Sequence, residues 1–260
     1  MPDSPLLFSV VAGVATIRFN RPQVFNSVNK EVALALQQHL RECQQDASVR
    51  AVLLTGTGKA FCAGQDLVEI TSPDSPEVAE IVEKHYNPIV QLIRELEKPV
   101  VAAVNGVAAG AGANLALACD VVVAKQSASF IQAFSKIGLI PDSGGTYFLP
   151  RLVGMQRASA LMLTGDKVSA AEAVQMGMIY KVFADEEFDQ AVETLVQKLA
   201  AMPTKGLAYT KQLLNGTFGN DLAQQLRNES DYQLRAGHTT DYHEGVAAFL
   251  EKRQPTFTGN

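Results

Sequence analysis

Residues 99–124 read PVVAAVNGVAAGAGANLALACDVVVA, and this stretch decides the fold. The apolar run at 99–104 predicts a strand, and a glycine-rich turn follows it. A short helix is expected at 112–118 and a second apolar strand at 120–124. Strands that alternate with helices at this spacing indicate an α/β fold.

The same stretch also tests a membrane interpretation, because no charged residue lies between Lys98 and Asp120. That interval is about as long as a membrane span. It is interrupted by Pro99, several glycines and Asn114, and most of its other residues are alanine and valine. It is therefore too weakly apolar for a span, and a buried strand, turn and helix fit it better.

Outward from this stretch, periodicity predicts further strands and helices on both sides. Ser169 and Glu172 form a capping box that opens a helix ended by Gly177. The remaining expected elements are a strand pair at 6–19, a helix at 29–46, a strand at 50–55, a helix at 77–96 interrupted by Pro88, a strand at 179–183 and a helix at 186–202.

The predicted secondary structure changes after Pro203, from alternating strands and helices to helices alone. Residues 204–252 carry amphipathic helical patterns without a clear strand, and such helices need a surface to cover. We expect a core at 1–202 and a C-terminal helical region at 203–260. That region is expected to pack on the core, on a neighbouring subunit, or on both.

Composition narrows the classes of function. The 260 residues include 22 basic and 27 acidic side chains, a formal charge of −5. This sign does not favour nucleic acid or an anionic membrane as a partner. The three cysteines, Cys43, Cys62 and Cys119, are widely spaced among apolar residues, and no basic segment opens the chain. Reduced core thiols and a cytoplasmic location are expected.

The sequence does not complete several familiar motifs of cofactor, nucleotide or metal sites. Gly110 and Gly112 follow a strand, but Leu115 occupies the third glycine position of a dinucleotide fingerprint. No Walker lysine motif is present, and residues 141–145 lack the first glycine of a nucleophile elbow. The four histidines have no metal-ligand spacing, so no metal site is expected.

Two glycine-containing loops follow predicted strands, at 61–66 (FCAGQD) and 105–112 (NGVAAGAG). Ligands of α/β proteins bind beyond the carboxyl ends of strands. Small residues let backbone amides approach a ligand, so the two loops are able to form an oxyanion hole. The alternative is that the glycines only permit tight turns and close helix–sheet packing, and the residues alone leave both interpretations open.

Asp142 stands before a Gly-Gly helix start and after an apolar run. In one interpretation it is a helix N-cap that contributes about 1 kcal/mol. In the other it is a carboxylate in apolar surroundings, where a raised pKa suits a general base. The sequence alone does not separate these two.

Taken together, the motifs resemble the crotonase (enoyl-CoA hydratase/isomerase) superfamily nearly from end to end. The segments that carry the resemblance are 20–22 (NRP) with Asn26, 61–67 (FCAGQDL), 99–106 (PVVAAVNG), 119–120 (CD), 138–141 (GLIP) with 144–146 (GGT), and 163–165 (LTG).

This resemblance implies a ββα-spiral core, a C-terminal helical trimerisation region, and a homo-trimer or hexamer that acts on an acyl-CoA thioester. CoA is then part of the substrate, and no separate cofactor is implied. By position, the backbone amides of Gln65 and Ala111 form the oxyanion hole, and Lys211 meets a CoA phosphate across a subunit interface. Residues that line the CoA path by resemblance are Val24, Phe25, Ala63, Asp66 and Leu67.

Departures from the superfamily pattern point to isomerisation. Its hydratases carry two glutamates, and those positions hold Asn114 and Phe134 here. Asp142 matches the aspartate of the superfamily's isomerases and is the expected catalytic base, while Asn114 is expected to orient the acyl group or a water molecule. Residues 86–88, 105–113, 130–145, 231–232 and 241–250 are most similar to isomerases of phenylacetate catabolism.

The expected function is therefore an acyl-CoA isomerase of the phenylacetate type, with one carboxylate base and an oxyanion hole. Two alternatives remain, a Δ3,Δ2-enoyl-CoA isomerase of fatty acyl chains and a catalytically silent CoA-binding scaffold. Other enzymes of the same pathway are further candidate partners.

Overall fold

The apolar strands expected from the sequence form one six-stranded sheet in the computed structural model, which describes residues 4–72 and 75–260. Strands β1 and β2 pair antiparallel, and the rest of the sheet is parallel. In spatial order, the strands are β1 (Leu6–Val11), β2 (Val14–Phe19), β3 (Ala51–Gly56), β5 (Val100–Val104), β7 (Val121–Lys125) and β10 (Lys181–Phe183).

A second sheet of four short strands was not expected from the sequence. Its strands are three residues long, too short for a periodicity to show. In spatial order they are β4 (Ala60–Cys62), β6 (Val107–Ala109), β8 (Ser129–Ile131) and β9 (Lys167–Ser169). Strands β3, β5 and β7 are each followed by one strand of this sheet, so the chain winds as a spiral of paired strands and helices.

This spiral is the ββα core that the motifs imply. The first glycine loop, at 61–66, overlaps the end of β4, and the second, at 105–112, contains all of β6.

Helices cover the sheets where the apolar periodicity predicted them. The interrupted helix at 77–96 consists of α3 (Val78–Glu80), a π-helical turn η2 (Ile81–Tyr86) and α4 (Asn87–Glu95), with Pro88 in the first turn of α4. The other helices of the core are α1 (Lys30–Gln45), α2 (Leu67–Ile70), α5 (Ala111–Leu117), α6 (Gly145–Val153), α7 (Met155–Thr164), α8 (Ala170–Gln175) and α9 (Phe188–Ala200), with 3-10 turns η1 (Pro22–Val24) and η3 (Ala133–Ile137).

Alternate residues of the large sheet face two different cores. Ala51 and Leu53 of β3 pack with helix α9, whereas Val52 and Leu54 face the main core, to which α1, α4 and α5 contribute. All six residues of β3 are buried. This double coverage is why the strand reads as a continuous apolar run.

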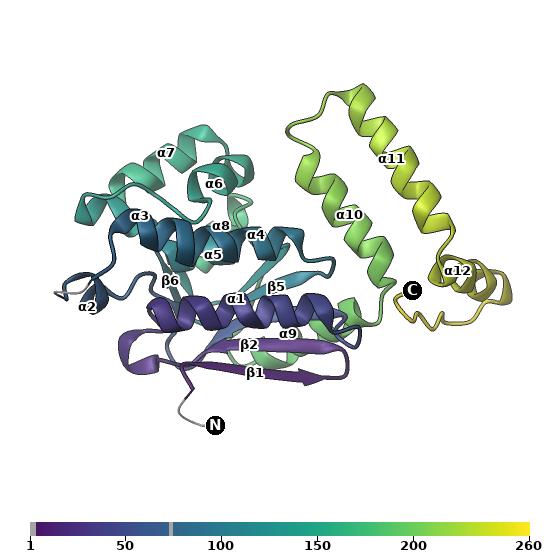
Figure 1. Cartoon of the computed structure of the whole chain (residues 1–260), viewed down its shortest axis with the longest axis horizontal. Coiled ribbons are helices and arrows are strands. Elements are labelled where there is room, and N and C mark those ends of the chain that lie inside the picture. Colours follow the sequence, from purple (N-terminus) through teal and green to yellow (C-terminus); the bar gives the residue numbers. More distant parts are fainter. Residues whose placement is uncertain (1–3, 73–74) are drawn as a thin grey trace.

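Residues after Pro203 form three helices and no strand, as expected: α10 (Thr204–Gly216), α11 (Leu222–Gly237) and α12 (Thr240–Glu251). Figure 1 shows α10 and α11 as a hairpin that stands beside the core. Arg50, next to β3, donates to the carbonyls of Met202 (2.7 Å) and Phe257 (3.1 Å). One core side chain thus binds the residue just before the C-terminal region and a residue near its end.

Candidate functional site

Asp142 lies in the turn between η3 and α6, where backbone conformation is unusual. Ser143 and Gly144 follow it with positive φ angles of 50° and 75°. The Ser143 hydroxyl donates to Asp142 Oδ1 at 2.8 Å. Burial raises the pKa of the Asp142 carboxyl above its usual value, and the Ser143 hydrogen bond offsets only part of that rise. A carboxylate of this kind suits a general base.

The alternative role of Asp142 as a helix cap is wrong. Gly144 is the N-cap residue of α6, and no side chain caps the helix. Only the backbone of Asp142 meets the helix, where its carbonyl accepts from Gly145 N at 2.8 Å. The carboxylate is therefore available for chemistry.

Asn114, in α5, holds the Asp142 turn from inside the protein. Its side chain is fully buried, with Nδ2 donating to the Asp142 carbonyl at 2.9 Å and Oδ1 accepting from Gln132 Nε2 at 2.8 Å. A Cβ atom on Gly145 would lie only 2.3 Å from Asn114 Nδ2. The absence of a side chain at Gly145 thus leaves space for this amide.

That geometry adds to the expected role of Asn114, because its amide positions the Asp142 turn within the protein. The orientation of an acyl group or a water molecule by Asn114 stays a prediction. The same residue ties Asp142 to α5, the helix whose first residue is Ala111.

The amides of Gln65 and Ala111 come from two loops that abut. A Cβ atom on Gly64 would lie 3.2 Å from Ala111 N and 2.9 Å from the Ala109 carbonyl, so only glycine fits there. Ala111 opens α5, and an N–H in the first turn of a helix has no acceptor within that helix. These amides can converge on one carbonyl oxygen.

Gln65 is held between neighbouring segments. Its backbone lies beside Val28, because Val28 N donates to the Gly64 carbonyl at 2.7 Å and Asp66 N donates to the Val28 carbonyl at 2.9 Å. In such a bridge, the N–H of the middle residue points away from the partner strand. The Gln65 amide therefore faces away from Val28.

The five residues expected along the CoA path do lie together next to Gln65. The amide of Ala63 donates to the Phe25 carbonyl at 3.0 Å, which joins the two segments. Phe25 and Leu67 are about half exposed, as a ligand-facing surface requires. Asp66 is different: its carboxylate pairs with Arg21 at 2.8 Å and caps α2 through Val68 N. Val24 completes the turn η1 beside Phe25.

Phe134 is buried against the start of α5. A Cβ atom on Gly110 would lie 3.8 Å from its Cζ atom. The ring therefore stands beside the turn that presents the Ala111 amide, and it makes that wall of the site apolar.

Lys211 is not part of this group. Its Nζ donates to the carbonyls of Ile93 (2.6 Å) and Lys98 (3.2 Å) and pairs with Asp120 at 2.8 Å. The side chain is only 6% exposed. A lysine with three partners inside its own chain has no free donor for a CoA phosphate, so the expected role is corrected: Lys211 anchors helix α10 to the core.

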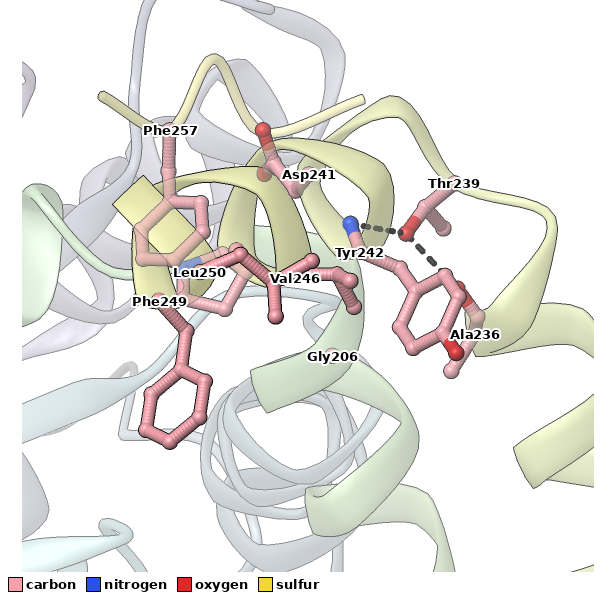
Figure 2. Close-up of a pocket in the computed structure, with 11 residues that line it drawn as sticks. Gly206, Ala236, Thr239, Asp241, Tyr242, Val246, Phe249, Leu250 and Phe257 are labelled. Atoms are coloured by element: carbon pink, nitrogen blue, oxygen red, sulfur yellow. Dashed lines mark hydrogen bonds between the residues drawn. The ribbon is translucent and has the colours of Figure 1, made fainter. Parts of the chain in front are cut away.

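One cavity lies in the C-terminal region, apart from the residues around Asp142 and Gln65. The cavity in Figure 2, of about 510 Å³, is lined by α10, the end of α11, α12 and Phe257. Its one carboxylate, Asp241, accepts from the amides of Thr258 and Gly259 at 2.7 and 2.8 Å. The lining is otherwise mostly apolar, from residues such as Val246 and Leu250. This cavity fits packing better than proton transfer.

Within residues 4–72 and 75–260, no group of three or more His, Cys, Asp or Glu side chains is placed to hold a metal ion. The helices of the same described ranges include none long and apolar enough to cross a membrane. The three cysteines are free and buried. Burial raises the pKa of Cys43 and of Cys62 to about 12, so these thiols are not nucleophiles.

Sequence reasoning missed Tyr86 as a member of the site. In the sequence it stood out only as part of the segment 86–88 that carries the resemblance, with no role of its own, yet its hydroxyl donates to Gln65 Oε1 at 3.0 Å. The signal was present, because a buried tyrosine needs a partner for its hydroxyl. Glu69 and Gln132 were also missed, since single polar side chains carry no periodic signal.

Comparison with known proteins agrees with this architecture. Residues 9–260 match the family described as Enoyl-CoA hydratase/isomerase. The chain is 49% identical over 258 residues to 1,2-epoxyphenylacetyl-CoA isomerase of Escherichia coli (strain K12), with 98% of each chain covered. It is 43% identical over 252 residues to a protein of Rhodobacter capsulatus named "Probable enoyl-CoA hydratase", with 97% of each covered.

A solved structure has the same fold. The crystal structure of enoyl-CoA hydratase from Bacillus anthracis superposes with a TM-score of 0.94 at 33% identity, covering 98% of this chain and 100% of that one.

Proposed function

The chain belongs to the enoyl-CoA hydratase/isomerase family, and from that premise we propose that it isomerises 2-(1,2-epoxy-1,2-dihydrophenyl)acetyl-CoA to the oxepin-CoA. The finer assignment is supported by the relative of that activity at 49% identity. CoA is part of the substrate in this proposal, and no further cofactor takes part.

In the proposed mechanism, the amides of Gln65 and Ala111 donate to the thioester oxygen. They stabilise the negative charge that develops when an α-proton leaves, and one such donor is worth about 2.7–4 kcal/mol. The C–C bond between the two epoxide carbons breaks as the ring expands to the oxepin, while both C–O bonds remain. Asp142 removes the α-proton and returns it farther along the conjugated system, so substrate and product have the same composition. The observation that carries the proposal is the partly buried carboxylate of Asp142, whose turn is tied through Asn114 to the helix that begins with Ala111.

The test of the base is Asp142→Asn. We expect turnover to fall by about 10²–10⁴-fold, because general-base catalysis contributes about this much. The fold and CoA-ester binding should survive, because the side chain of Asp142 does not cap α6. Asp166→Asn, at an exposed aspartate in the turn after α7, is the matched control. Near wild-type turnover of Asp142→Asn would refute the mechanism.

Hydration is the competing activity, since one close relative carries that name. It needs one group to activate water and another to protonate the α-carbon. Asn114 is engaged within the protein, and Phe134 presents an apolar wall. We therefore expect loss of the conjugated-thioester absorbance of crotonyl-CoA at well under a tenth of the rate of an authentic hydratase. A rate within about tenfold of that reference would overturn the isomerase assignment.

Two further alternatives are distinguished by substrate profile. A Δ3,Δ2-enoyl-CoA isomerase uses the same base and oxyanion hole, and it would turn over 3-enoyl-CoA chains faster than the epoxide. A silent CoA-binding scaffold would bind CoA esters without exchanging their α-protons.

We also propose that the protein assembles as a trimer or a hexamer through its C-terminal helices. The support is apolar exposure: Leu222 (74%), Phe249 (82%) and Leu250 (74%) are open to solvent in the single chain. Large apolar side chains that stay exposed on consecutive helices are favourable sites for contact with another copy of the chain.

A further inference from the structure

Tyr86 is a buried polar side chain to which the proposed mechanism gives no role. It has no exposed surface and ends the π-helical turn η2, a type of distortion that is frequent at functional sites. Its hydroxyl donates to Gln65 Oε1 at 3.0 Å. Burial holds the pKa of Tyr86 well above its usual value, and the charges of Asp142 and Glu69 act in the same direction. The hydroxyl thus stays a donor.

The Gln65 side chain is fixed at its other end as well. Gln65 Nε2 donates to Glu69 Oε2 at 2.7 Å, and Glu69 Oε1 accepts from Lys30 N, at the start of α1, at 2.8 Å. Both functional atoms of the amide are therefore engaged, one toward η2 and one toward α1 and α2. A glutamine side chain otherwise has three rotatable bonds, so this double attachment removes most of its freedom.

The backbone of the same residue is held from a third direction by the bridge between Val28 and residues 64–66. With the side chain and the flanking peptides fixed, the direction of the Gln65 N–H is fixed too. Resting on the function proposed above, we propose that Tyr86 is a positioning residue that acts through the Gln65 side chain to aim this amide at the thioester oxygen.

A direct role of Tyr86 as a proton donor to the substrate fits less well. Its one hydroxyl proton is directed at Gln65 Oε1. A misplaced oxyanion donor weakens charge stabilisation in the transition state more than ground-state binding, so the defect appears in kcat rather than in KM.

The experiment uses Tyr86→Phe, Gln65→Ala and the double variant, with Tyr180→Phe as a control that removes an exposed hydroxyl. The probe is phenylacetyl-CoA in D₂O, whose α-proton exchange reports enolate formation without isomerisation. We expect Tyr86→Phe to lower the exchange kcat by about 10–100-fold with KM within about twofold, because donor position and orientation carry effects of this size. Tyr180→Phe should match the wild type.

The double variant separates the two modes of action. If Tyr86 acts through Gln65, Tyr86→Phe combined with Gln65→Ala is no slower than the slower single variant. If the two losses multiply, Tyr86 acts on the substrate itself and the proposal is wrong. An unchanged exchange rate in Tyr86→Phe overturns it equally. If Tyr86→Phe does not fold, Glu69→Ala is used instead, because it releases the other end of the Gln65 side chain. We expect this variant to lower the exchange kcat as well. An unchanged kcat in Glu69→Ala would overturn the proposal.

Failure of the wider function gives a different result. A wild-type protein that binds phenylacetyl-CoA without exchanging its α-protons would refute the isomerase proposal itself. An exchanging wild type with an unaffected Tyr86→Phe refutes only the positioning role.

Discussion

Helices α1 and α11 have the same length of 16 residues but very different surroundings. Six residues of α1 are buried, whereas α11 has no fully buried residue. Leu36 of α1 is 1% exposed, and Leu226 of α11 is 54% exposed. Both helices carry an apolar stripe, so the difference lies in what the rest of the chain supplies to cover it.

The comparison teaches that an amphipathic pattern specifies a face but not its partner. In the core, the sheet and neighbouring helices cover the apolar face of α1. In the C-terminal region, α10 lies against α11 (Figure 1). The leucines Leu222, Leu226 and Leu234 of α11 nevertheless stay exposed. A second copy of the chain is the partner proposed above.

The largest contrast is expected from a matched pair of leucine substitutions. Leu36→Ala should lower the free energy of unfolding by about 2–5 kcal/mol at any protein concentration, because it opens a cavity in a packed core. Leu226→Ala should cost less than about 0.5 kcal/mol in a single chain. If a neighbouring subunit covers α11, the loss of unfolding free energy caused by Leu226→Ala grows with protein concentration.

The measurement is thermal unfolding over a concentration series, with sedimentation on the same samples. The wild type should sediment as a trimer or hexamer. A monomer at micromolar concentration, with equal melting temperatures throughout the series, would contradict the assembly.

A second substitution tests the attachment of the two regions. Lys211→Met should lower the free energy of unfolding by about 3 kcal/mol, at the low end for a broken buried ion pair, because Arg94 still pairs with Asp120. Lys205→Met, on an exposed face of the same helix, is the control and should stay within about 0.5 kcal/mol of the wild type.

The KM of the Lys211→Met variant for the CoA ester shows whether Lys211 anchors α10 or contacts the ligand. Unchanged KM in a folded Lys211→Met protein agrees with an anchor. A large rise in KM with unchanged stability would restore the CoA-phosphate role that the structure argues against.

The smallest expected effect concerns Asp142. Burial of its ionised carboxylate lowers the free energy of unfolding at neutral pH. Its folded-state pKa is raised by burial, so the folded protein holds the proton more tightly than the unfolded chain. Its contribution to stability is therefore present at low pH and is lost as the pH rises through the raised pKa. Asp142→Asn should unfold at a slightly higher temperature than the wild type at pH 7, and the gain should vanish as the pH falls below about 3.9, the unfolded value.

Activity should show the opposite dependence on pH. The base works only when ionised, so the rate should fall as the pH drops through the raised pKa of Asp142. A pH–rate profile on the wild type checks this, and a profile that is flat below neutrality would argue against Asp142 as the base.

Local pattern by itself determined the α/β class, the positions of the long strands and helices, and the helical character of residues 204–252. Periodicity and caps report these directly, as at the capping box of Ser169 and Glu172. The motifs also predicted which loops meet, since Gln65 and Ala111 do stand on abutting turns.

Tertiary structure alone decided which side chains are free to act. The short strands of the second sheet have no periodicity of their own and are defined by their partners. Asn114 and Lys211 are polar residues at positions open to a ligand role, but each finds its hydrogen-bond partners on segments distant along the chain. Burial and partners depend on what packs across the space, and for Asp142, Gln65 and Tyr86 they separate a capping or core residue from one placed for catalysis.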